Sequence, residues 1–236
     1  MSSIKDDKGY NQGFELVTST RIRMMRRASF FSKAMEPGKD KQALEIGCGT
    51  GEISYWIARD AGISVLGTDI CVPFIDQAAE QYKLDNLRYE VLDFNNPGQI
   101  MGRKFDYVFG NGILHHLYYN LDNSLLAIKA LLKPGGKLIF MEPNIYNPYC
   151  QLIFKIPALR KWANLEPDEM AFSNVFIRKK LEQAGYTDIR VTFRDFLLPG
   201  IPAFLVKPSI FIGNIAERVP LVRVMAQSIF IEATIH

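Results

Sequence analysis

Short apolar runs alternate along this chain with longer amphipathic stretches. The runs that favour buried strands are Ala43–Ile46, Ser64–Ile70, Leu87–Phe94, Phe105–Phe109, Lys137–Asn144, Asp188–Phe196 and Ser228–Ala233. The stretches that favour helices are Phe14–Ala34, one from about Gly51 or Glu52, Pro73–Leu84, Asn123–Leu132 and Ser173–Gly185. Strands and helices in this alternation predict a doubly wound α/β fold, in which helices cover both faces of a mostly parallel sheet.

A glycine-rich turn follows the first predicted strand at once. Gly47, Gly49 and Gly51 make this turn too tight for side chains, and a helix begins directly after it. Strand, glycine turn and helix in this order cradle an adenosine-type cofactor. A dinucleotide fingerprint needs glycine at the sixth position counted from Gly47, where this chain has Glu52. Glu45 and Glu52 flank the turn, so they would repel a pyrophosphate and suit a ligand that carries sulfonium and ammonium groups.

The turn resembles the first motif of the class I, Rossmann-like S-adenosylmethionine-dependent methyltransferases, which has the form E-x-G-x-G-x-G. The run LLKPGGKLIFMEPN, from Leu131 to Asn144, is also characteristic of this family. The likeness is strong over about Lys41–Gly136 and extends to the C-terminus by pattern. It implies a seven-stranded sheet with an antiparallel last strand, S-adenosylmethionine as the cofactor, and a small or lipid-like methyl acceptor.

Two functions of other kinds stay open. A nicotinamide-dependent oxidoreductase would use a similar fold, although Glu45 and Glu52 disfavour its dinucleotide. A non-catalytic binding module would keep the S-adenosylmethionine site without the reaction.

Acidic residues end the next two predicted strands. Asp69 lies about 20 residues beyond the glycines, where a carboxylate accepts hydrogen bonds from both ribose hydroxyls. In the resembled family an acid after the third strand binds the adenine amino group and the next residue packs against the ring; Asp93 and Phe94 match these positions. A loop-capping role for Asp93 stays open. The cofactor-binding residues that the resemblance implies are Glu45, Gly47, Cys48, Gly49, Gly51, Asp69, Ile70, Asp93, Phe94 and Asn111.

Two histidines follow the fourth predicted strand, in the crevice where open α/β sheets bind ligands. A histidine with a pKa of about 6.5 can deprotonate a hydroxyl as the methyl group arrives, which predicts O-methylation with His116 or His115 as the base. Neighbouring residues on a helix point about 100° apart, so at most one of the two faces the pocket squarely, and we favour His116. Because a sulfonium is already an activated leaving group, transfer without a base stays open, and the histidines would then only shape the pocket. Glu142 to Asn144, at the next strand end, are expected to line the substrate site.

Three segments surround the predicted cofactor core at residues 41–144, within one domain that spans residues 1–236. Residues 1–40 are expected to form a helical lid, with Tyr10 as a lid residue by analogy with the family. Its arginines at positions 21, 23, 26 and 27 favour a solvated helix face, while a hold on the cofactor carboxylate and contact with anionic lipid stay open.

The other two segments, at residues 145–172 and 197–226, are expected to cap the acceptor. Their aromatic and aliphatic residues fit ordinary core, a homodimer interface, an apolar tunnel or a membrane-facing surface. Pro199, Pro202, Pro208 and Lys207 interrupt the second segment, which argues against a spanning helix.

The composition of the chain bears on core size, nucleic-acid binding, metal binding and cellular location. A chain of 236 residues with 48% hydrophobic content can bury a full core. The net charge of +3 is too small to indicate nucleic acid, and no N-P-P-[YF] motif is present. Cys48, Cys71 and Cys150 have no CxxC spacing and the histidines have no ligand spacing, so we expect no metal site and a reduced cytoplasmic protein. The polar N-terminal residues predict no secretory signal, and a peripheral position at the membrane stays open.

Overall fold

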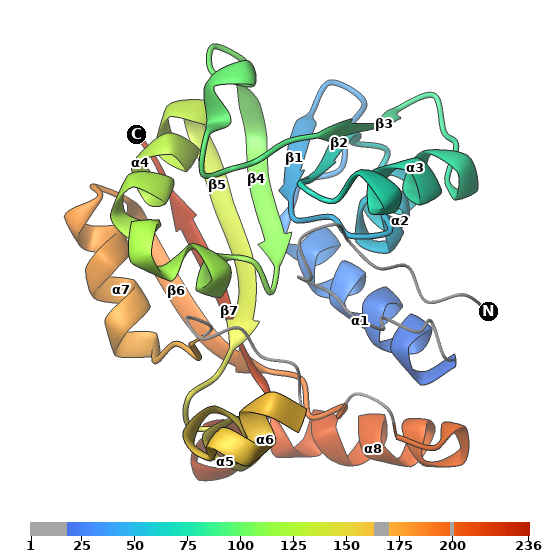
Figure 1. Ribbon diagram of the computed structural model, residues 1–236, viewed down its shortest axis with the longest axis vertical. Helices are drawn as coiled ribbons and strands as arrows, with labels where there is room; N and C mark the ends of the chain where they lie inside the picture. Colours follow the sequence, from blue (N-terminus) through green and yellow to red (C-terminus); the bar gives the residue numbers. More distant parts are fainter. Residues whose placement is uncertain (1–17, 163–169, 199–200) are drawn as a thin grey trace.

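A seven-stranded sheet forms the centre of the molecule in the computed structural model, which describes residues 18–162, 170–198 and 201–236 (Figure 1). The strand order is β3-β2-β1-β4-β5-β7-β6. Neighbouring strands are parallel from β3 to β5, whereas β7 runs antiparallel to both β5 and β6. The predicted mostly parallel sheet with an antiparallel last strand is confirmed.

The strands are β1 (Gln42–Ile46), β2 (Ser64–Asp69), β3 (Leu87–Val91), β4 (Phe105–Asn111), β5 (Leu132–Pro143), β6 (Thr187–Arg194) and β7 (Ser228–Thr234). The α-helices are α1 (Thr18–Ala34), α2 (Glu52–Ala61), α3 (Val72–Gln81), α4 (Leu121–Leu131), α5 (Pro148–Lys155), α6 (Pro157–Trp162), α7 (Asn174–Gln183), α8 (Ala203–Ala216) and α9 (Pro220–Arg223). Two short 3-10 helices are η1 (Pro97–Gln99) and η2 (Leu114–Asn120). The expected start of the first helix at Phe14, like Tyr10, lies outside the described residues.

Two hydrophobic cores lie on opposite faces of the sheet, because successive side chains of a strand point to opposite faces. On one face Ala43 packs with Phe31 of α1 and Ile57 of α2. On the other face Leu44 belongs to the core formed with α4 and α7. Strands buried on both faces are apolar at almost every position, which is why the sequence shows continuous apolar runs rather than alternation.

The fifth strand begins earlier than the sequence predicts. The sequence predicts a helix that ends at Leu132 and a strand that begins at Lys137, but α4 ends at Leu131 and β5 already begins at Leu132, whose backbone is extended. Leu132 pairs with Phe105 of β4, and the next pair of the ladder joins Tyr107 to Lys137 after a register shift. The residues between the two pairs therefore form a bulge within the strand rather than a helix cap.

Pro208 does not end the main helix of the second cap segment. Pro208 lies inside α8, where its ring removes one N–H group from the hydrogen-bonding pattern of the helix. The helix continues over fourteen residues, from Ala203 to Ala216. Within the described parts of the chain, no helix has both the length and the apolar character needed to cross a membrane.

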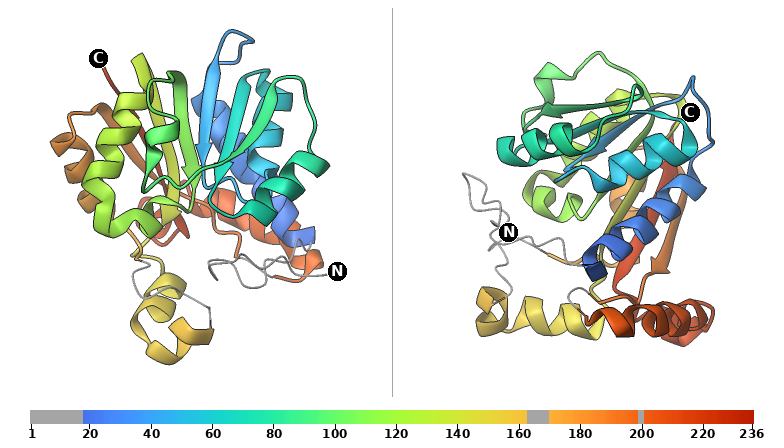
Figure 2. Two further views of the ribbon diagram at one scale, coloured as in Figure 1. Left: turned by 45° about the horizontal axis from the view of Figure 1, so that its top comes forward. Right: turned by 90° about the vertical axis from the view of Figure 1, so that its right-hand side faces the viewer.

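Both cap segments leave the same edge of the sheet. The first follows the C-terminal end of β5 and contains α5 and α6, and the second follows β6 and contains α8 and α9. Figure 2 shows α5, α6 and α8 along one end of the molecule, beyond the strand ends, as Figure 1 does. Because β6 runs parallel to β5, this is the edge at which β1, β2 and β4 also end.

Candidate active site

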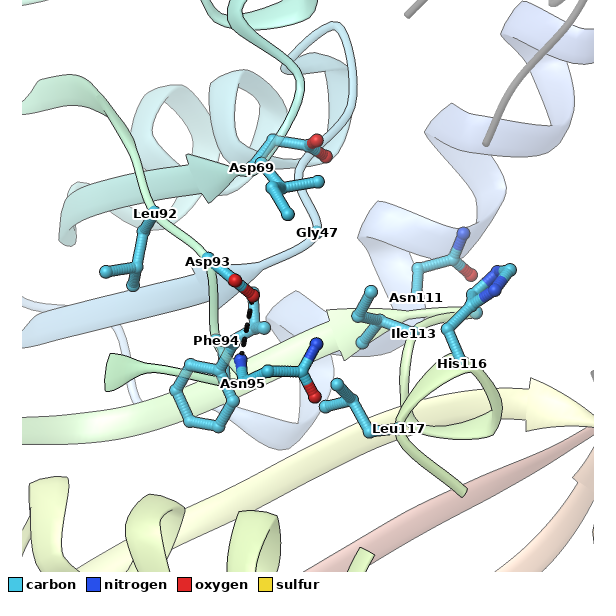
Figure 3. A pocket seen from close by; sticks show the side chains of 13 residues that line it. Gly47, Asp69, Leu92, Asp93, Phe94, Asn95, Asn111, Ile113, His116 and Leu117 are labelled. Carbon is cyan, nitrogen blue, oxygen red and sulfur yellow. Dashed lines mark hydrogen bonds between the residues drawn. The ribbon is translucent and has the colours of Figure 1, made fainter. Parts of the chain in front are cut away.

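A cavity of about 250 Å³ opens where the strands β1, β2 and β4 end and the loop after β3 begins (Figure 3). The residues predicted from the sequence that line it are Gly47, Asp69, Ile70, Asp93, Phe94, Asn111 and His116. Ile46, Leu92, Asn95, Gly112, Ile113 and Leu117 complete the wall and were not predicted. The apolar residues among them are ordinary strand-end and helix positions, so nothing in their pattern marks them as part of a site.

A smaller hollow of about 70 Å³ lies on the other side of the glycine turn. Glu45, Cys48 and Glu52 line it, together with Met24 of α1. The two hollows share Gly47 and Asn111. Among the described residues that line either hollow, none is a lysine or arginine, so both have acidic and apolar walls.

Two glycines of the turn are required by close contacts. Gly47 has φ 68°, and a Cβ there would lie 2.8 Å from Ile113 Cδ1. Gly51 has φ 86°, and a Cβ there would lie 2.6 Å from the hydroxyl of Tyr89. Any larger residue would therefore add a clash to a left-handed backbone, and the turn stays open to a ligand only with glycine.

Asp69 joins this turn to the end of the second strand. Its Oδ2 accepts a hydrogen bond from the Gly49 N–H at 2.8 Å, and its Oδ1 accepts one from the Cys71 N–H at 2.9 Å. The same carboxylate lines the cavity, where Figure 3 shows it close to Gly47. Asp69 therefore fixes the turn and also forms part of the cavity wall.

The two glutamates beside the turn are buried. Glu45 is 1% exposed and accepts a hydrogen bond from the Ser54 hydroxyl. Burial, and to a smaller extent the negative charge of Glu52, raises the pKa of Glu45 to about 8, against the effect of the Ser54 hydrogen bond. Burial also raises the pKa of Glu52, whose two oxygens lie 2.9 and 2.8 Å from the Thr50 hydroxyl. Near neutral pH the Glu45 carboxyl is mostly protonated, and a cation bound beside it would favour the ionised form.

Asp93 and Phe94 follow β3, which ends at Val91, three residues before the predicted strand end. The Asp93 carboxylate accepts hydrogen bonds from the Asn95 N–H at 3.0 Å and the Asn96 side-chain amide at 3.2 Å (Figure 3). Asp93 thus has the loop-capping contacts that stayed open from the sequence, and it also lines the cavity. The Phe94 ring is 6% exposed and forms part of the cavity wall.

The histidine pair is divided between the cavity and the interior. His116, in η2, lines the cavity, whereas His115 is 7% exposed and its Nδ1 lies 2.7 Å from Glu142 Oε2. Burial first, and the neighbouring His115 second, lowers the pKa of His116 to about 3. His116 is therefore neutral throughout the physiological pH range.

Glu142 holds the turn that carries the histidines. Its carboxylate is fully buried and accepts hydrogen bonds from the N–H groups of Ile113 at 3.0 Å and Leu114 at 2.9 Å. Neither Glu142 nor Asn144 lines this cavity, and their expected place at the substrate site stays a prediction. The Asn144 side-chain amide instead donates to the carbonyls of Val224 and Ala226, at 2.8 and 2.7 Å. Both side chains have their hydrogen bonds inside the fold, because a buried polar group needs a partner there.

The arginines of α1 do not form a solvated face. The guanidinium groups of Arg23, Arg26 and Arg27 approach the fully buried carboxylate of Asp195 at 3.8, 3.5 and 3.3 Å. Asp195 lies just after β6 with φ 68°. Arg27 also donates to Asn111 Oδ1 at 2.7 Å, so α1 reaches the cavity wall through this amide. Of the four predicted arginines, only the exposed Arg21 fits the solvated interpretation.

Comparison with known proteins agrees with this geometry. Residues 44–138 match a family model described as a methyltransferase domain. The chain is 34% identical over 113 residues to a hybrid PKS-NRPS synthetase of Trichoderma harzianum, a match that covers 44% of this chain and 3% of that protein. This chain therefore spans only a small part of the length of that relative.

Two solved structures share the fold. A SAM dependent methyltransferase from Archaeoglobus fulgidus has a TM-score of 0.65 and 17% identity, over 91% of this chain and 94% of that chain. The CurJ carbon methyltransferase has a TM-score of 0.60 and 22% identity, over 93% of this chain and 56% of that chain. At these identities the likeness concerns the fold alone. In doubly wound proteins of this fold class, cofactors bind at the C-terminal edge of the sheet, where the observed cavity lies.

Proposed function

We propose that this chain, whose residues 44–138 match a methyltransferase domain, is an S-adenosylmethionine-dependent methyltransferase that methylates a small molecule whose nucleophilic atom carries a proton, and that His116 accepts this proton. The acceptor atom is a hydroxyl oxygen or an acidic carbon. The observation that carries the proposal is the place of His116: a half-buried, neutral imidazole in the wall of the cavity that also contains Asp69, Asp93 and Asn111. A neutral imidazole has a ring nitrogen that can accept a proton.

The walls of the two hollows support the assignment of the cofactor residues. Asp69 is proposed to accept hydrogen bonds from the ribose hydroxyls, and Asp93 from the adenine amino group, with Phe94 against the ring. Glu45 and Glu52 line the smaller hollow, where they would stabilise a positively charged group. When bound there, S-adenosylmethionine supplies an activated methyl group on a positive sulfur. A nicotinamide dinucleotide would bring phosphates to walls that contain no basic residue among the described lining.

The low pKa of His116 fits a base that works only during methyl transfer. In the free protein, burial disfavours the imidazolium. During the reaction the site loses the sulfonium charge at the moment His116 takes up the proton of the acceptor, so the buried volume gains no net charge. Glu142 positions the segment that carries His116 through its hydrogen bonds to the preceding N–H groups.

Several wider features belong to the same proposal. The N-terminal segment is proposed as a lid, supported by Met24 in the wall of the smaller hollow. The segments at 145–172 and 197–226 are proposed as caps, supported by their position at the edge that carries the cavity. Cys48, Cys71 and Cys150 are free and buried, which suits a reduced cytoplasmic location. Homodimer formation and the lack of a nucleic-acid partner stay predictions.

The experiment is a transfer assay with methyl-labelled S-adenosylmethionine and three acceptor types: an aromatic hydroxyl, a carbon between two carbonyl groups, and a primary amine. Mass spectrometry of the product identifies the methylated atom. With a hydroxyl or carbon acceptor, His116→Ala should lower turnover by about 10²- to 10⁴-fold. The affinity for S-adenosylhomocysteine should stay within about twofold of wild type, because the substitution leaves the proposed ribose and adenine contacts in place.

The matched control is His236→Ala, because the His236 side chain is 76% exposed. This variant should keep wild-type turnover. Full turnover in His116→Ala would end the base hypothesis and leave transfer without a base. Methylation of the amine alone would contradict the proposed acceptor class.

A further inference from the structure

We propose that the outer face of α8 and α9, continued by α5 and α6, docks on an anionic lipid membrane. This face is called the cap surface. It lies outside the cavity and takes no part in the proton transfer described above, so the inference stands on separate observations.

The orientation of α8 is the first observation. Val206 and Gly213, seven residues apart, are the buried positions of this helix, and a Cβ on Gly213 would lie 3.1 Å from Phe196 Cβ. The opposite side carries Phe204, Phe211 and Ile215, with 77%, 68% and 51% of their surface exposed. Spacings of seven and four residues place these three on one helix face. The apolar face of α8 therefore points away from the protein.

Neighbouring segments extend this apolar face. Leu221 of α9 is 86% exposed, and on the first cap segment Leu152 and Ile156 are 54% and 40% exposed. Figure 1 and the right-hand view of Figure 2 place α5, α6 and α8 at the same end of the molecule, although the left-hand view of Figure 2 shows α5 and α6 apart from α8. Large exposed apolar residues gathered at one end of a molecule indicate an interaction surface rather than scattered exposure.

The positive charge of the cap surface favours an anionic membrane as its partner. The exposed basic residues of these four helices and their connections are Lys155, Lys161, Lys207, Arg218 and Arg223. In the described residues from α5 to α6 and from α8 to α9, the single acidic residue is Glu217, whose carboxylate pairs with Arg26 at 3.1 Å and Arg194 at 3.2 Å. Exposed apolar side chains among basic ones match the interface of a membrane that contains anionic lipids. A second copy packed on the same surface would place these cations against one another.

The length of α8 fits a helix that lies on a membrane. Fourteen residues extend about 21 Å at 1.5 Å per residue, shorter than the roughly 30 Å hydrocarbon core. The sheet edge that leads into the cap surface also carries the cofactor cavity. Docking would therefore bring this edge of the enzyme to the lipid phase.

The test is co-sedimentation of the full chain with vesicles of phosphatidylcholine and phosphatidylglycerol, compared with phosphatidylcholine alone. Wild type should sediment with the anionic vesicles and much less with the neutral ones. The apolar variant is Phe204→Ser, Phe211→Ser and Leu221→Ser combined, and its partition should fall about tenfold or more. The matched control is Leu126→Ser with Val175→Ser, on α4 and α7, where the side chains are 52% and 67% exposed. This control should bind vesicles like wild type.

Charge variants separate the two contributions. The combined variant Lys207→Gln, Arg218→Gln and Arg223→Gln should lower partition onto anionic vesicles by about fivefold per charge. Its control is Lys39→Gln, Lys83→Gln and Lys179→Gln, which removes equal charge from exposed positions outside the cap surface and should change little. Thermal stabilisation by S-adenosylhomocysteine should be the same in all variants, which distinguishes failure of docking from failure of the cofactor site.

Three outcomes would overturn the proposal. Wild type could fail to sediment with either kind of vesicle. The apolar variant could bind as well as wild type. Wild type could be a dimer in solution that the apolar variant converts to monomer without any vesicle binding, in which case a second copy covers the cap surface.

Discussion

The cofactor edge and the cap surface lie at the same end of the sheet but are built in different ways. At the cofactor edge, the contacts of the predicted carboxylates join residues that are close in sequence. Asp93 contacts Asn95, two residues away, and Asp69 contacts Gly49, twenty residues away. The cap segments are held by contacts over long separations, such as Asn144 with Ala226. Local contacts leave a pattern that can be found in the sequence, whereas long-range contacts do not.

The two regions also treat polarity in opposite ways. The cofactor edge buries carboxyl groups such as Glu45, at 1% exposed, and surrounds a cavity with them. The cap surface exposes large apolar side chains such as Leu221, at 86%. Buried acids suit a small cationic ligand, while exposed apolar groups suit a broad interface. The following predictions test this contrast in order of expected effect.

The largest effect is expected where α1 is tied to the cap segments. Asp195→Ala would leave the guanidinium groups of Arg23, Arg26 and Arg27 buried without their common carboxylate. We expect the free energy of unfolding to fall by about 3–5 kcal/mol, measured by urea denaturation. The control is Asp122→Ala, because Asp122 is 66% exposed in its pair with Lys180 and should cost about 1 kcal/mol or less. Similar losses in both variants would show that the Asp195 cluster does not anchor the lid.

The next effect concerns cofactor affinity. Asp69→Asn keeps the size of the side chain but removes a charged acceptor, so S-adenosylhomocysteine should bind about 1.5–3 kcal/mol more weakly in isothermal titration calorimetry. Wild type should prefer this ligand over its 2′,3′-dideoxy analogue, and the variant should lose most of that preference. Asp76→Asn, at an exposed position of α3, is the control. If Asp69→Asn weakened both ligands equally, Asp69 would only brace the turn.

A pH effect is expected from Glu45. Its pKa is about 8 in the folded protein and near 4.5 without burial, so the folded state binds more protons between these values. The free energy of unfolding should therefore fall as pH rises from about 4.5 to 8, with a slope of up to about 1.4 kcal/mol per pH unit. His116, with a pKa lowered from 6.5 to about 3, gives the opposite slope below pH 6.5. Measurements between pH 6.5 and 8 exclude the contribution of His116, and Glu45→Gln should flatten the profile there. An unchanged profile in Glu45→Gln would rule out Glu45 as the titrating group.

The smallest effect on stability is expected at the cap surface. Phe204→Ser and Phe211→Ser should change the free energy of unfolding by no more than about 0.5 kcal/mol each, because both rings are already exposed. Phe31→Ala is the contrast, since Phe31 is fully buried and should cost about 3–5 kcal/mol. A large loss in the exposed variants would mean that the cap surface is packed against part of the protein.

Local signals made the sheet and the glycine turn predictable. Gly47 and Gly51 occur where the backbone has positive φ, and the spacing to Asp69 follows from one strand, turn and helix. Helical geometry predicted only that at most one of the two histidines faces the pocket, and the preference for His116 had no further basis in the sequence. The structure adds the physical reason, because Glu142 draws His115 into the interior.

Long-range partners could not be found in the same way. Arg27 was assigned to a solvated face, since its partner Asp195 is 168 residues away and lies in a left-handed conformation that only the folded chain reveals. Pro208 was counted among the residues that argue against a membrane-spanning helix, yet it does not end α8, because a helix can lose one hydrogen bond and continue. Glu142 and Asn144 lie at the predicted sheet edge. Their side chains, however, hydrogen-bond to segments that are distant in sequence, inside the fold.

Hydrogen–deuterium exchange with and without saturating S-adenosylmethionine tests the location of the cofactor site most directly. The predicted result is slower amide exchange in residues 47–51, 92–95 and 111–117, with no change in residues 203–223. Unchanged exchange in those three turns, or protection confined to α8 and α9, would contradict the cofactor site described above.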